Sequence, residues 1–287
     1  MIITVHVNMT RENAFEVATN VCEQLNNLNV RVLMPAELSE YFCQDYISFL
    51  DATDCVRDCD ILISIGGDGT IIHSAFDAVN FDKPILGINA GRLGFLAGLE
   101  KEELELLENL ITGNYTIDNR MRLSVKYFEG DKLKGEYTCL NDVVIARGTA
   151  LKLCEIEARN KSKLIFDYLA DGLIVATPTG STAYSLSSGG PVVDTGIESL
   201  ILTPICNHSL FSRSMIFKPD AEIELSIKNH DNCLPVFSCD GEPGIPMQVN
   251  SRIVISRAER YTKIIRIKSD SFSDILSHKL IERYGQI

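Results

Sequence analysis

The sequence predicts an α/β N-terminal domain, a parallel sheet flanked by helices, followed by a mainly antiparallel β-rich C-terminal domain. The chain has 287 residues, which suits about two domains of ~100–200 residues each. Short apolar runs alternate with helical patterns in the first part, which favours a parallel sheet covered by helices. Beyond residue 119, apolar and polar residues alternate in short segments bounded by turns, which favours antiparallel strands. We therefore expect domains at residues 1–118 and 119–268, and a C-terminal helical segment at 269–287 that packs back on the first domain.

Strands and helices follow each other through the predicted first domain. Apolar runs predict strands at residues 2–7, 30–34, 60–65 and 84–88. The third run is apolar almost throughout, as expected for a strand buried on both faces. Helical spacing of apolar residues predicts a helix that Thr10 caps, a second from Ile71 to Val79, and a third that ends at Gly113.

The predicted second domain shows a different periodicity. Leu123, Val125 and Tyr127 alternate with polar residues and precede a turn at residues 129–131. Similar runs at 223–227 and 236–237 predict further strands of an antiparallel sheet. A helix-like insert interrupts them at 181–186, and helical spacing returns at 272–281.

Composition excludes several classes of protein. The 27 basic and 39 acidic residues give a net charge of −12, and no basic cluster stands out, so we expect no nucleic-acid partner. No apolar run approaches the ~20 residues of a membrane helix, and the N-terminus lacks the pattern of a signal peptide. The nine scattered cysteines indicate reduced thiols in a cytoplasmic protein. The only close pair, Cys55 and Cys59, does not predict a zinc site, which needs four matched ligands.

A glycine-rich turn follows the third strand, at Gly66-Gly67-Asp68-Gly69-Thr70. Its glycines let the backbone turn sharply and approach a ligand, and the next helix offers a positive N-terminus, so a phosphate is the natural guest. Asp68 would repel a phosphate unless it accepts a hydrogen bond from a hydroxyl or meets the phosphates through a metal ion. A simple Asp-Gly turn with a solvated carboxylate stays open. No Walker A motif occurs in the chain.

A second glycine-rich stretch runs from Gly87 to Leu96 and includes Asn89, Gly91 and Gly94. Its spacing is Gly-x3-Gly-x2-Gly, which differs from the dinucleotide fingerprint Gly-x-Gly-x2-Gly. The stretch is a strand end and a tight loop, and composition alone allows a packing turn as readily as a ligand loop.

Polar pairs and hydroxyls mark two stretches of the second domain. Asn141-Asp142 opens an apolar run, and an adjacent amide and carboxylate can bind a base edge and ribose hydroxyls, although a plain turn fits too. From Asp171 to Tyr184 a buried-looking strand leads into a loop rich in Thr and Ser. Such a loop offers hydroxyls and free N–H groups that can bind an adenine or an amide, and Tyr184 offers a flat face for stacking. The alternative interpretation is a capped helix with surface hydroxyls and no ligand.

Together these stretches resemble the NAD kinase family. Gly-Gly-Asp-Gly-Thr by itself is shared with diacylglycerol and sphingosine kinases and 6-phosphofructokinases. The later blocks are more specific: Gly87–Leu96 is similar to Gly-x-Asn-x-Gly-x-Leu-Gly-Phe-Leu, and Asp171–Tyr184 closely follows Asp-Gly-x4-Thr-Pro-x-Gly-Ser-Thr-Ala-Tyr. The match continues through Ser-Ser-Gly-Gly-Pro and a short Cys239-Asp240-Gly241. Where the family carries Asn-Glu, this chain has Asn141-Asp142, one methylene shorter.

The resemblance implies a phosphotransferase. ATP, or polyphosphate, would phosphorylate the 2′-hydroxyl of the adenosine ribose of NAD to give NADP, with Mg2+ bridging the donor phosphates. It implies homodimers or homotetramers and no membrane partner. The resemblance makes Asp68 the candidate general base and places Gly66, Gly67, Gly69 and Thr70 in the phosphate loop. It places Asn141, Thr179 and Thr182 on the adenine side, Asp171 and Ala183 at the nicotinamide end, and Tyr184 near the nucleotide. Asp142, at the position of the family's Glu, would contact the bound nucleotide. NAD would also contact Gly67, Asp68 and Gly69.

Two alternatives remain at this point. A lipid kinase of the diacylglycerol type shares the glycine turn, but such enzymes usually carry a Glu in the next helix, and Ile71–Phe76 contains none. A non-catalytic NAD or NADP sensor is the other, and retention of Asp68 argues against it, since a pure binder has no use for a carboxylate beside phosphates.

Overall fold

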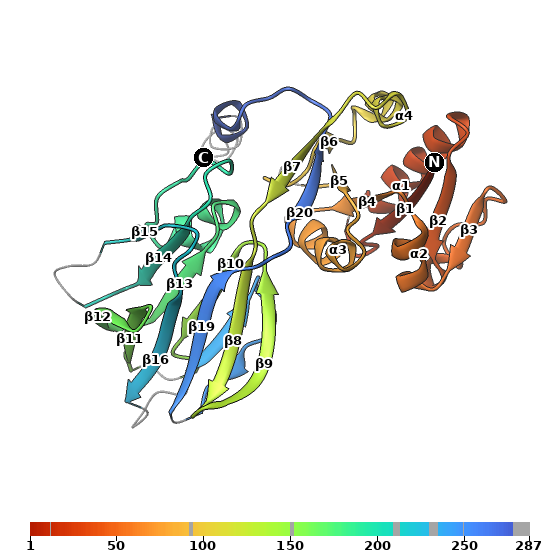
Figure 1. Ribbon diagram of the computed structural model, residues 1–287. Helices are drawn as coiled ribbons and strands as arrows, with labels where there is room; N and C mark the ends of the chain where they lie inside the picture. The colour runs from red at the N-terminus through yellow and green to blue at the C-terminus, as the bar shows by residue number, and fades with distance from the viewer. Residues whose placement is uncertain are drawn as a thin grey trace. The chain divides into compact units, whose positions relative to one another are not determined.

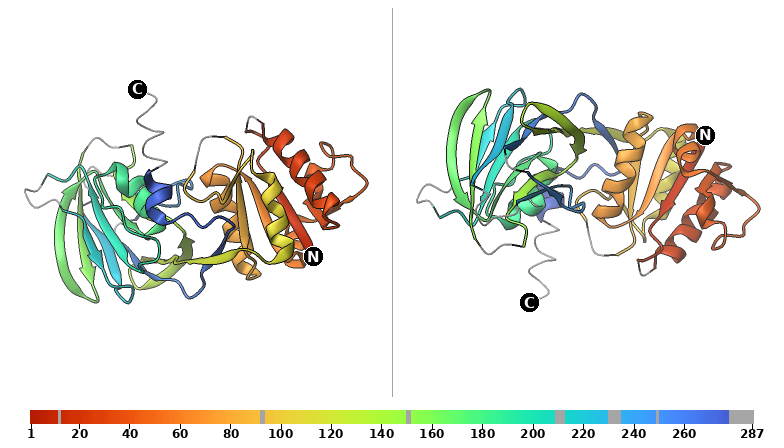
Figure 2. Two further views of the ribbon diagram at one scale, coloured as in Figure 1. Left: turned by 90° about the horizontal axis from the view of Figure 1, so that it is seen from above. Right: turned by 90° about the horizontal axis from the view of Figure 1, so that it is seen from below.

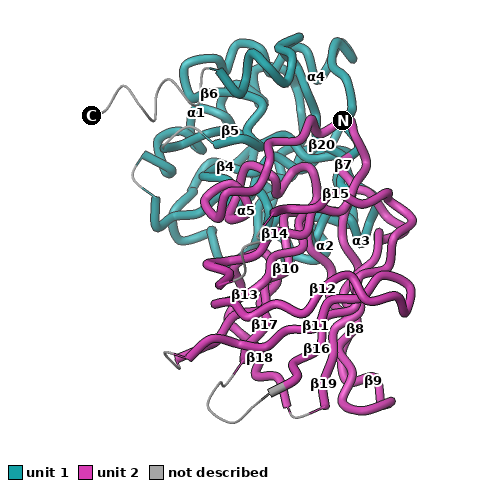
Figure 3. The backbone as a smooth tube through the Cα atoms, turned by 90° about the vertical axis from the view of Figure 1, so that its left-hand side faces the viewer, with its two compact units in different colours: residues 1–119, 262–287 teal, residues 120–261 magenta. Residues whose placement is uncertain are grey.

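The structure, a computed structural model, describes residues 1–11, 13–91, 94–149, 152–208, 213–229, 235–248 and 250–277. The chain divides into two compact units (Figure 3). Unit 1 comprises Met1–Asn119 and Thr262–Ile287, and unit 2 comprises Arg120–Tyr261. The predicted second domain extended to residue 268, whereas the division falls at residue 261, because the last strand pairs inside unit 1.

Unit 1 is built on a largely parallel sheet. Its strands are β1 (Ile2–Val7), β2 (Arg31–Pro35), β3 (Ile47–Leu50), β4 (Ile61–Gly66), β5 (Ile85–Asn89), β6 (Leu99–Glu100), β7 (Thr116–Arg120) and β20 (Thr262–Arg266). Within the described residues they form one eight-stranded sheet in the order β3-β2-β1-β4-β5-β20-β7, with β6 beside β5. The pairings β1–β2, β1–β4, β2–β3, β4–β5, β5–β6 and β5–β20 are all parallel.

Helices cover both faces of this sheet, as the sequence predicts (Figure 2). The helical segments are α1 (Ala14–Asn27), η1 (Ala36–Leu38), α2 (Ala52–Asp58), α3 (Asp68–Asn80), η2 (Leu104–Leu107) and α4 (Glu108–Thr112). Ile61, Ile63 and Ile65 of β4 share a buried cluster with α1, η2 and α4. Alternate residues face the other side, where the Ser64 and Ser74 hydroxyls bond at 2.9 Å and tie α3 to β4. Every residue of β4 is buried, which explains its continuous apolar run.

Some predicted details of unit 1 are wrong. Thr10 does not cap the first helix; its hydroxyl bonds to the Asn8 side chain, and α1 begins after Asn13, whose φ is 65°. The four-residue strand β3 and the seven-residue helix α2 were not predicted, because elements this short carry too few apolar repeats to show a period. Gly113 does end α4, in the left-handed conformation with φ 73°.

Unit 2 consists of antiparallel sheets, as predicted (Figure 1). Within the described residues, one sheet has the order β15-β14-β13-β10-β17-β18 and the other β12-β11-β16-β19-β8-β9. The strands of the first are β10 (Asp142–Ala146), β13 (Gly172–Ala176), β14 (Leu200–Ile205), β15 (Met215–Phe217), β17 (Val236–Cys239) and β18 (Ile245–Pro246). Those of the second are β8 (Leu123–Glu129), β9 (Lys132–Cys139), β11 (Cys154–Asn160), β12 (Lys163–Ala170), β16 (Ile223–Asn229) and β19 (Ser251–Arg257). Apolar side chains of both sheets form one core.

The predicted helical insert is present as two short segments between β13 and β14. They are η3 (Thr179–Thr182) and α5 (Tyr184–Ser187). At the C-terminus residues 272–277 are helical. Residues 269–271 of the predicted helical segment at 269–287 are not helical, and residues 278–287 lie outside the described residues.

The cysteines differ from the prediction at one position. Seven described cysteines are free thiols, but Cys154 at the start of β11 is disulfide-bonded. The prediction that every cysteine is reduced is therefore wrong for Cys154, since spacing along the chain does not show which thiols meet in space. Among the described helices, none combines the length and apolarity that crossing a membrane requires.

Candidate functional site

The glycine turn lies where β4 ends and α3 begins. Gly66 is the last residue of β4, and a Cβ there would lie 2.5 Å from the Thr70 hydroxyl. Gly67 is the N-cap of α3, and a Cβ on Gly67 or Gly69 would meet no atom within 4 Å. These two glycines therefore leave the backbone of the first helical turn open to a ligand. Because N–H groups at a helix start lack helical partners, the turn is suited to bind an anion.

Asp68, the first residue of α3, connects the two glycine-rich stretches. Its carboxylate accepts hydrogen bonds from the backbone N–H of Phe95 at 2.8 Å and of Leu96 at 3.0 Å. A Cβ on Gly94 would lie 2.1 Å from Asp68 Oδ1, so a larger residue there would displace the carboxylate. Asp68 is thus held at the glycine turn by two backbone hydrogen bonds, and the interpretation of a merely solvated carboxylate does not fit this geometry.

Asn141 and Asp142 lie beside the Thr-rich loop in unit 2, although thirty-odd residues separate them along the chain. The Thr177 N–H donates to the Asn141 carbonyl at 2.8 Å, and the Thr177 hydroxyl donates to the Leu140 carbonyl at 2.6 Å. A Cβ on Gly180 would lie 2.1 Å from the Asn141 carbonyl oxygen. Glycine at 180 is thus required for the close approach of η3 to the start of β10.

Asp240 fixes this segment from the other side. Its carboxylate accepts the backbone N–H groups of Leu140, Asn141 and Asp142 at 2.6, 2.7 and 3.0 Å. Asp240 has φ 49° and Gly241 φ 80°, so the Asp-Gly pair forms a turn that only such residues adopt readily. Cys239-Asp240-Gly241 showed only a short resemblance to the family, and the positioning role of Asp240 becomes visible only in the fold.

The Asp142 carboxyl group is nearly inaccessible, with 5% of the residue exposed. Burial, and then the charge of Asp240, raises the pKa of Asp142 from 3.8 to about 7. Burial also raises the pKa of Asp240, although three backbone N–H groups and the Arg122 guanidinium oppose the shift. Two buried carboxyl groups that repel each other are typical of functional sites, where a ligand relieves the cost.

The hydroxyls of the Thr-rich loop are mostly engaged inside unit 2. Arg120 donates to the Thr179 hydroxyl at 3.2 Å, and the Thr182 hydroxyl donates to the Thr179 carbonyl at 3.2 Å. The Thr179 hydroxyl therefore keeps its own hydrogen to donate, and the Thr182 oxygen keeps lone pairs to accept. Ser181 is fully buried and bonds to Pro178 and Val193, so its role is to fix the loop.

The remaining predicted residues lie at the ends of this loop. Asp171 precedes β13 and pairs with Arg147 Nε at 3.0 Å. Ala183 lies between η3 and α5, and Tyr184 is 47% exposed. The sequence analysis did not predict that Arg120, Arg147 and Asp240 would hold site residues in place. Asp240 had a sequence signal, the short resemblance at Cys239-Asp240-Gly241, whereas Arg120 and Arg147 had none. The residues of the glycine turn thus lie in unit 1, and the predicted NAD-binding residues 141–184 lie in unit 2.

Comparison with known proteins agrees with these two sets of residues. Residues 2–115 match the ATP-NAD kinase N-terminal domain, and residues 140–267 match the ATP-NAD kinase C-terminal domain. The NAD kinase of Thermoanaerobacter sp. (strain X514) is 41% identical over 233 residues, which cover 81% of this chain and 82% of that protein. The NAD kinase of Heliobacterium modesticaldum is 34% identical over 280 residues, covering 97% and 98%.

Solved structures show the same fold. Yeast NADH kinase complexed with NADH has a TM-score of 0.87 at 24% identity, covering 98% of this chain and 87% of that chain. An NAD kinase from Archaeoglobus fulgidus in complex with ATP has a TM-score of 0.73 at 24% identity and covers 100% of both chains.

A glycine turn suited to an anion, at the carboxyl end of an inner strand of a parallel sheet, and a β-rich unit with a hydroxyl-rich loop are the features of a two-domain α/β and β-rich protein suited to bind a nucleotide. Within that class, the matches over both units and the identities above 30% are decisive. The chain belongs to the NAD kinase family.

Proposed function

We propose that the protein transfers a phosphoryl group from ATP, or polyphosphate, to the 2′-hydroxyl of the adenosine ribose of NAD and so produces NADP. Family membership supports the reaction. The observation that carries it here is Asp68, which is held by the Phe95 and Leu96 N–H groups inside the phosphate-binding turn. A carboxylate in an anion-binding turn has a use when a hydroxyl must be deprotonated beside a phosphate.

Asp68 acts as the general base in this proposal. A ribose hydroxyl is a weak nucleophile at neutral pH, and a fixed carboxylate can accept its proton as the bond to phosphorus forms. Each oxygen of Asp68 accepts one backbone N–H and keeps a second lone pair for the hydroxyl. General-base assistance of this kind typically contributes about 10²–10⁴ in rate.

Mg2+ fits this site as a partner of the donor phosphates. Among the described residues, no group of three or more His, Cys, Asp or Glu side chains could hold a metal ion. Magnesium commonly keeps several waters and binds substrate phosphates, so it would be held here through the donor phosphates, and Asp68 would remain free to accept the hydroxyl proton. When bound, Mg2+ would offset the negative charge of the donor phosphates.

NAD is proposed to bind to the residues gathered in unit 2. Asn141, Thr179 and Thr182 would contact the adenosine side, since the Thr179 hydroxyl can donate and the Thr182 oxygen can accept. Asp142 would contact the bound nucleotide. Asp171 and Ala183 would hold the nicotinamide end, with Tyr184 near the nucleotide. The buried Asp142 carboxyl is the strongest support, because ribose hydroxyls would give it the donors it needs.

A panel of donors and acceptors tests the proposal. Purified protein with Mg2+ would be given NAD or NADH as acceptor, and ATP, other nucleoside triphosphates or polyphosphate as donor, with NADP measured by enzymatic coupling. NADP should form from NAD. Binding of NAD without turnover would instead support the sensor, and phosphorylation of diacylglycerol would support a lipid kinase.

A homodimer or homotetramer is proposed as the assembled form. The edge strand β12 exposes Leu164, Phe166 and Leu169 at 53%, 36% and 42%, and apolar side chains on an edge strand are a suitable contact for a second copy. Sedimentation of the protein and of Leu164→Asp tests the assembly. We also place the protein in the cytoplasm, because seven described cysteines are free thiols; the disulfide at Cys154 is uncommon in that compartment.

A further inference from the structure

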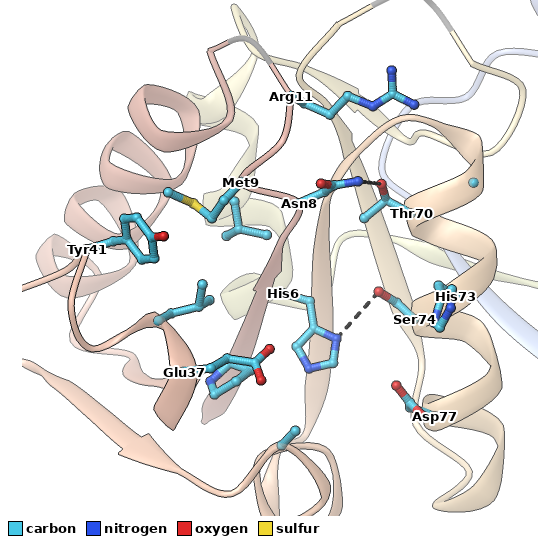
Figure 4. A pocket seen from close by; sticks show the side chains of 15 residues that line it. His6, Asn8, Met9, Arg11, Glu37, Tyr41, Thr70, His73, Ser74 and Asp77 are labelled. Carbon is cyan, nitrogen blue, oxygen red and sulfur yellow. Dashed lines mark hydrogen bonds between the residues drawn. The ribbon is translucent and has the colours of Figure 1, made fainter.

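Unit 2 contains a buried arginine close to residues 140–142, which we call the NAD-binding segment. Arg122 lies just before β8 and is only 3% exposed. The cavity in unit 1 (Figure 4), by contrast, belongs to the site already described, since Gly69 and Thr70 of the glycine turn line it. A buried guanidinium is costly unless neighbouring groups compensate its charge and bind its N–H groups. The groups around Arg122 therefore indicate its role.

Hydrogen bonds hold Arg122 at its backbone and at its side chain. Its carbonyl oxygen accepts the Ala258 N–H at 2.8 Å, which fixes the residue beside the end of β19. Its Nη2 donates to the Thr138 hydroxyl at 2.7 Å. Thr138 lies in β9, two residues before Leu140, so this bond holds the chain where it enters the NAD-binding segment.

The guanidinium charge also acts on the carboxylate that holds this segment. Asp240 accepts the backbone N–H groups of all three of its residues. Burial raises the pKa of Asp240, and these three bonds and the charge of Arg122 oppose the shift. Burial in turn lowers the pKa of Arg122, and the charge of Asp240 opposes that shift. Arg122 thus acts on the segment in two ways, through Thr138 and through Asp240.

Asp240 can bind three N–H groups well only while it is ionised. Its Oδ1 accepts two of them and its Oδ2 accepts the third, so a proton on either oxygen would weaken at least one bond. Other groups oppose the negative charge, because Asp240 also acts on the Asp142 carboxyl and on the Cys139 thiol, which shares a hydrogen bond with Cys239. The charge of Arg122 favours the ionised form.

We propose that Arg122 is a positioning residue for NAD: it keeps Asp240 ionised, and Asp240 then holds Asn141 and Asp142 in the arrangement that binds the nucleotide. The proposal rests on the proposed function, because it takes Asn141 and Asp142 as part of the NAD site. Arg122 acts through Asp240 and does not itself touch NAD. Its loss should therefore change NAD binding more than kcat.

Two substitutions separate the charge of Arg122 from its hydrogen bond. Arg122→Gln keeps an N–H donor for Thr138 and removes the charge, whereas Arg122→Lys keeps the charge. An opposite charge nearby typically lowers a carboxyl pKa by about 1–3 units, so without it Asp240 takes up a proton at a higher pH. The Kd of NAD for Arg122→Gln should exceed that of the wild type at least about tenfold at pH 6 and only about threefold at pH 8.

Arg122→Lys should stay within about threefold of the wild type at both pH values, because it keeps the charge. Arg159→Gln is the matched control, since it removes a guanidinium that bonds to Glu157 and to the Ser162 carbonyl. This control should stay within about twofold at both pH values. Repeating the comparison in an Asp142→Asn background removes the titration of Asp142 itself.

A double-mutant cycle tests whether Arg122 acts through Asp240. The amide of Asp240→Asn cannot ionise, so adding Arg122→Gln to it should weaken NAD binding by less than about twofold more. A merely structural role of Arg122 would instead add its full effect. Urea denaturation at each pH identifies folded variants, and if Asp240→Asn does not fold, the contrast between Arg122→Gln and Arg122→Lys decides.

Calorimetric titration with NAD measures these affinities without turnover. Amide hydrogen exchange at residues 140–142 gives a second measurement without NAD, and at pH 6 it should be faster in Arg122→Gln than in the wild type. A pH-independent effect of Arg122→Gln, an equal effect of Arg122→Lys or Arg159→Gln, additivity in the cycle, or unchanged exchange would overturn the inference. Absence of NAD binding or of NADP formation, with the difference in exchange intact, would instead overturn the proposed function.

Discussion

At the scale of single residues, Asp68 performs two tasks with one carboxylate. It accepts the Phe95 and Leu96 N–H groups, which joins the second glycine-rich stretch to α3. In the proposed reaction it also accepts the proton of the ribose hydroxyl. Both tasks need the negative charge of Asp68, but proton transfer also needs its carboxylate oxygens in their exact positions. One substitution that removes the charge and another that displaces the carboxylate can therefore separate the two tasks.

Asp68→Asn should lower kcat by about 10²–10⁴ while NAD still binds, because an amide cannot take the proton. Gly94→Ala keeps the carboxylate but places a Cβ 2.1 Å from its present oxygen position, so kcat should fall here as well. Turnover at low and high Mg2+, with NAD titration by calorimetry, measures both effects. Partial rescue of Asp68→Asn by Mg2+ would assign Asp68 to the metal instead, and wild-type turnover would exclude both roles.

Asp142 gives a second prediction at this scale. If its buried carboxyl binds a nucleotide hydroxyl, Asp142→Ala should raise the NAD KM by roughly tenfold, corresponding to about 1–2 kcal/mol for a lost hydrogen bond to a charged group. Its kcat should change less. Steady-state kinetics with NAD as the varied substrate decides the matter. Unchanged KM and kcat would make Asp142 a turn residue at the start of β10.

At the scale of elements, η3 and β10 are joined by a contact that only glycine permits. The Gly180→Ala substitution would place a Cβ within 2.1–2.8 Å of the Asn141 backbone, which has no room to move because Asp240 holds it. We expect a loss of about 1–3 kcal/mol in unfolding free energy, as for other overpacked sites, and a raised NAD KM.

Urea denaturation and kinetics measure these two effects. Gly196→Ala serves as the matched control, since its Cβ would make an ordinary 3.4 Å contact with Asp194. Equal stability of the two variants would show that η3 shifts freely against β10.

At the scale of the whole molecule, Asp142 couples stability to pH. Its pKa is about 7 in the folded protein and near 3.8 when unfolded, so between these values the folded state retains a proton that the unfolded chain has lost. The free energy of unfolding, as far as it depends on Asp142, is therefore greatest below pH ~4 and declines as the pH rises to ~7. Three pKa units correspond to about 4 kcal/mol as an upper bound.

Asp142→Asn should remove this dependence. The variant should be more stable than the wild type at pH 8 by about 1–4 kcal/mol, and the difference should shrink toward pH 4. Unfolding in urea across this pH range measures it, with the exposed Asp45→Asn as control. A constant difference at all pH values would show that Asp142 does not titrate between 4 and 7.

Domain limits also belong to this scale. The first division between the units falls between residues 119 and 120, and the periodicity of the sequence changes near residue 119. The return of the chain at residue 262 could not be predicted, because β20 resembles the antiparallel strands that precede it. Its pairing with β5 involves Ile264 and Ile85, which are far apart along the chain. The spacing of apolar residues within a short segment cannot predict a contact between such distant residues.

The sequence by itself determined the order of strands and helices around β1, β4 and β5, because buried parallel strands require unbroken apolar runs. It also determined the glycine turn and the Thr-rich loop, since their residue types are dictated by local backbone geometry. Short elements such as β3 and α2 were not predicted, because they contain too few residues to show a periodic pattern.

Only the tertiary structure decided which groups hold these motifs in place. Asp240 fixes Asn141 from about a hundred residues away, and the Phe95 and Leu96 N–H groups fix Asp68 from nearly thirty. It likewise decided that Asp142 is buried and that the charge of the buried Arg122 acts on Asp240. The physical reason is that burial and charge proximity depend on distances in space, which the spacing of residues along a chain does not specify.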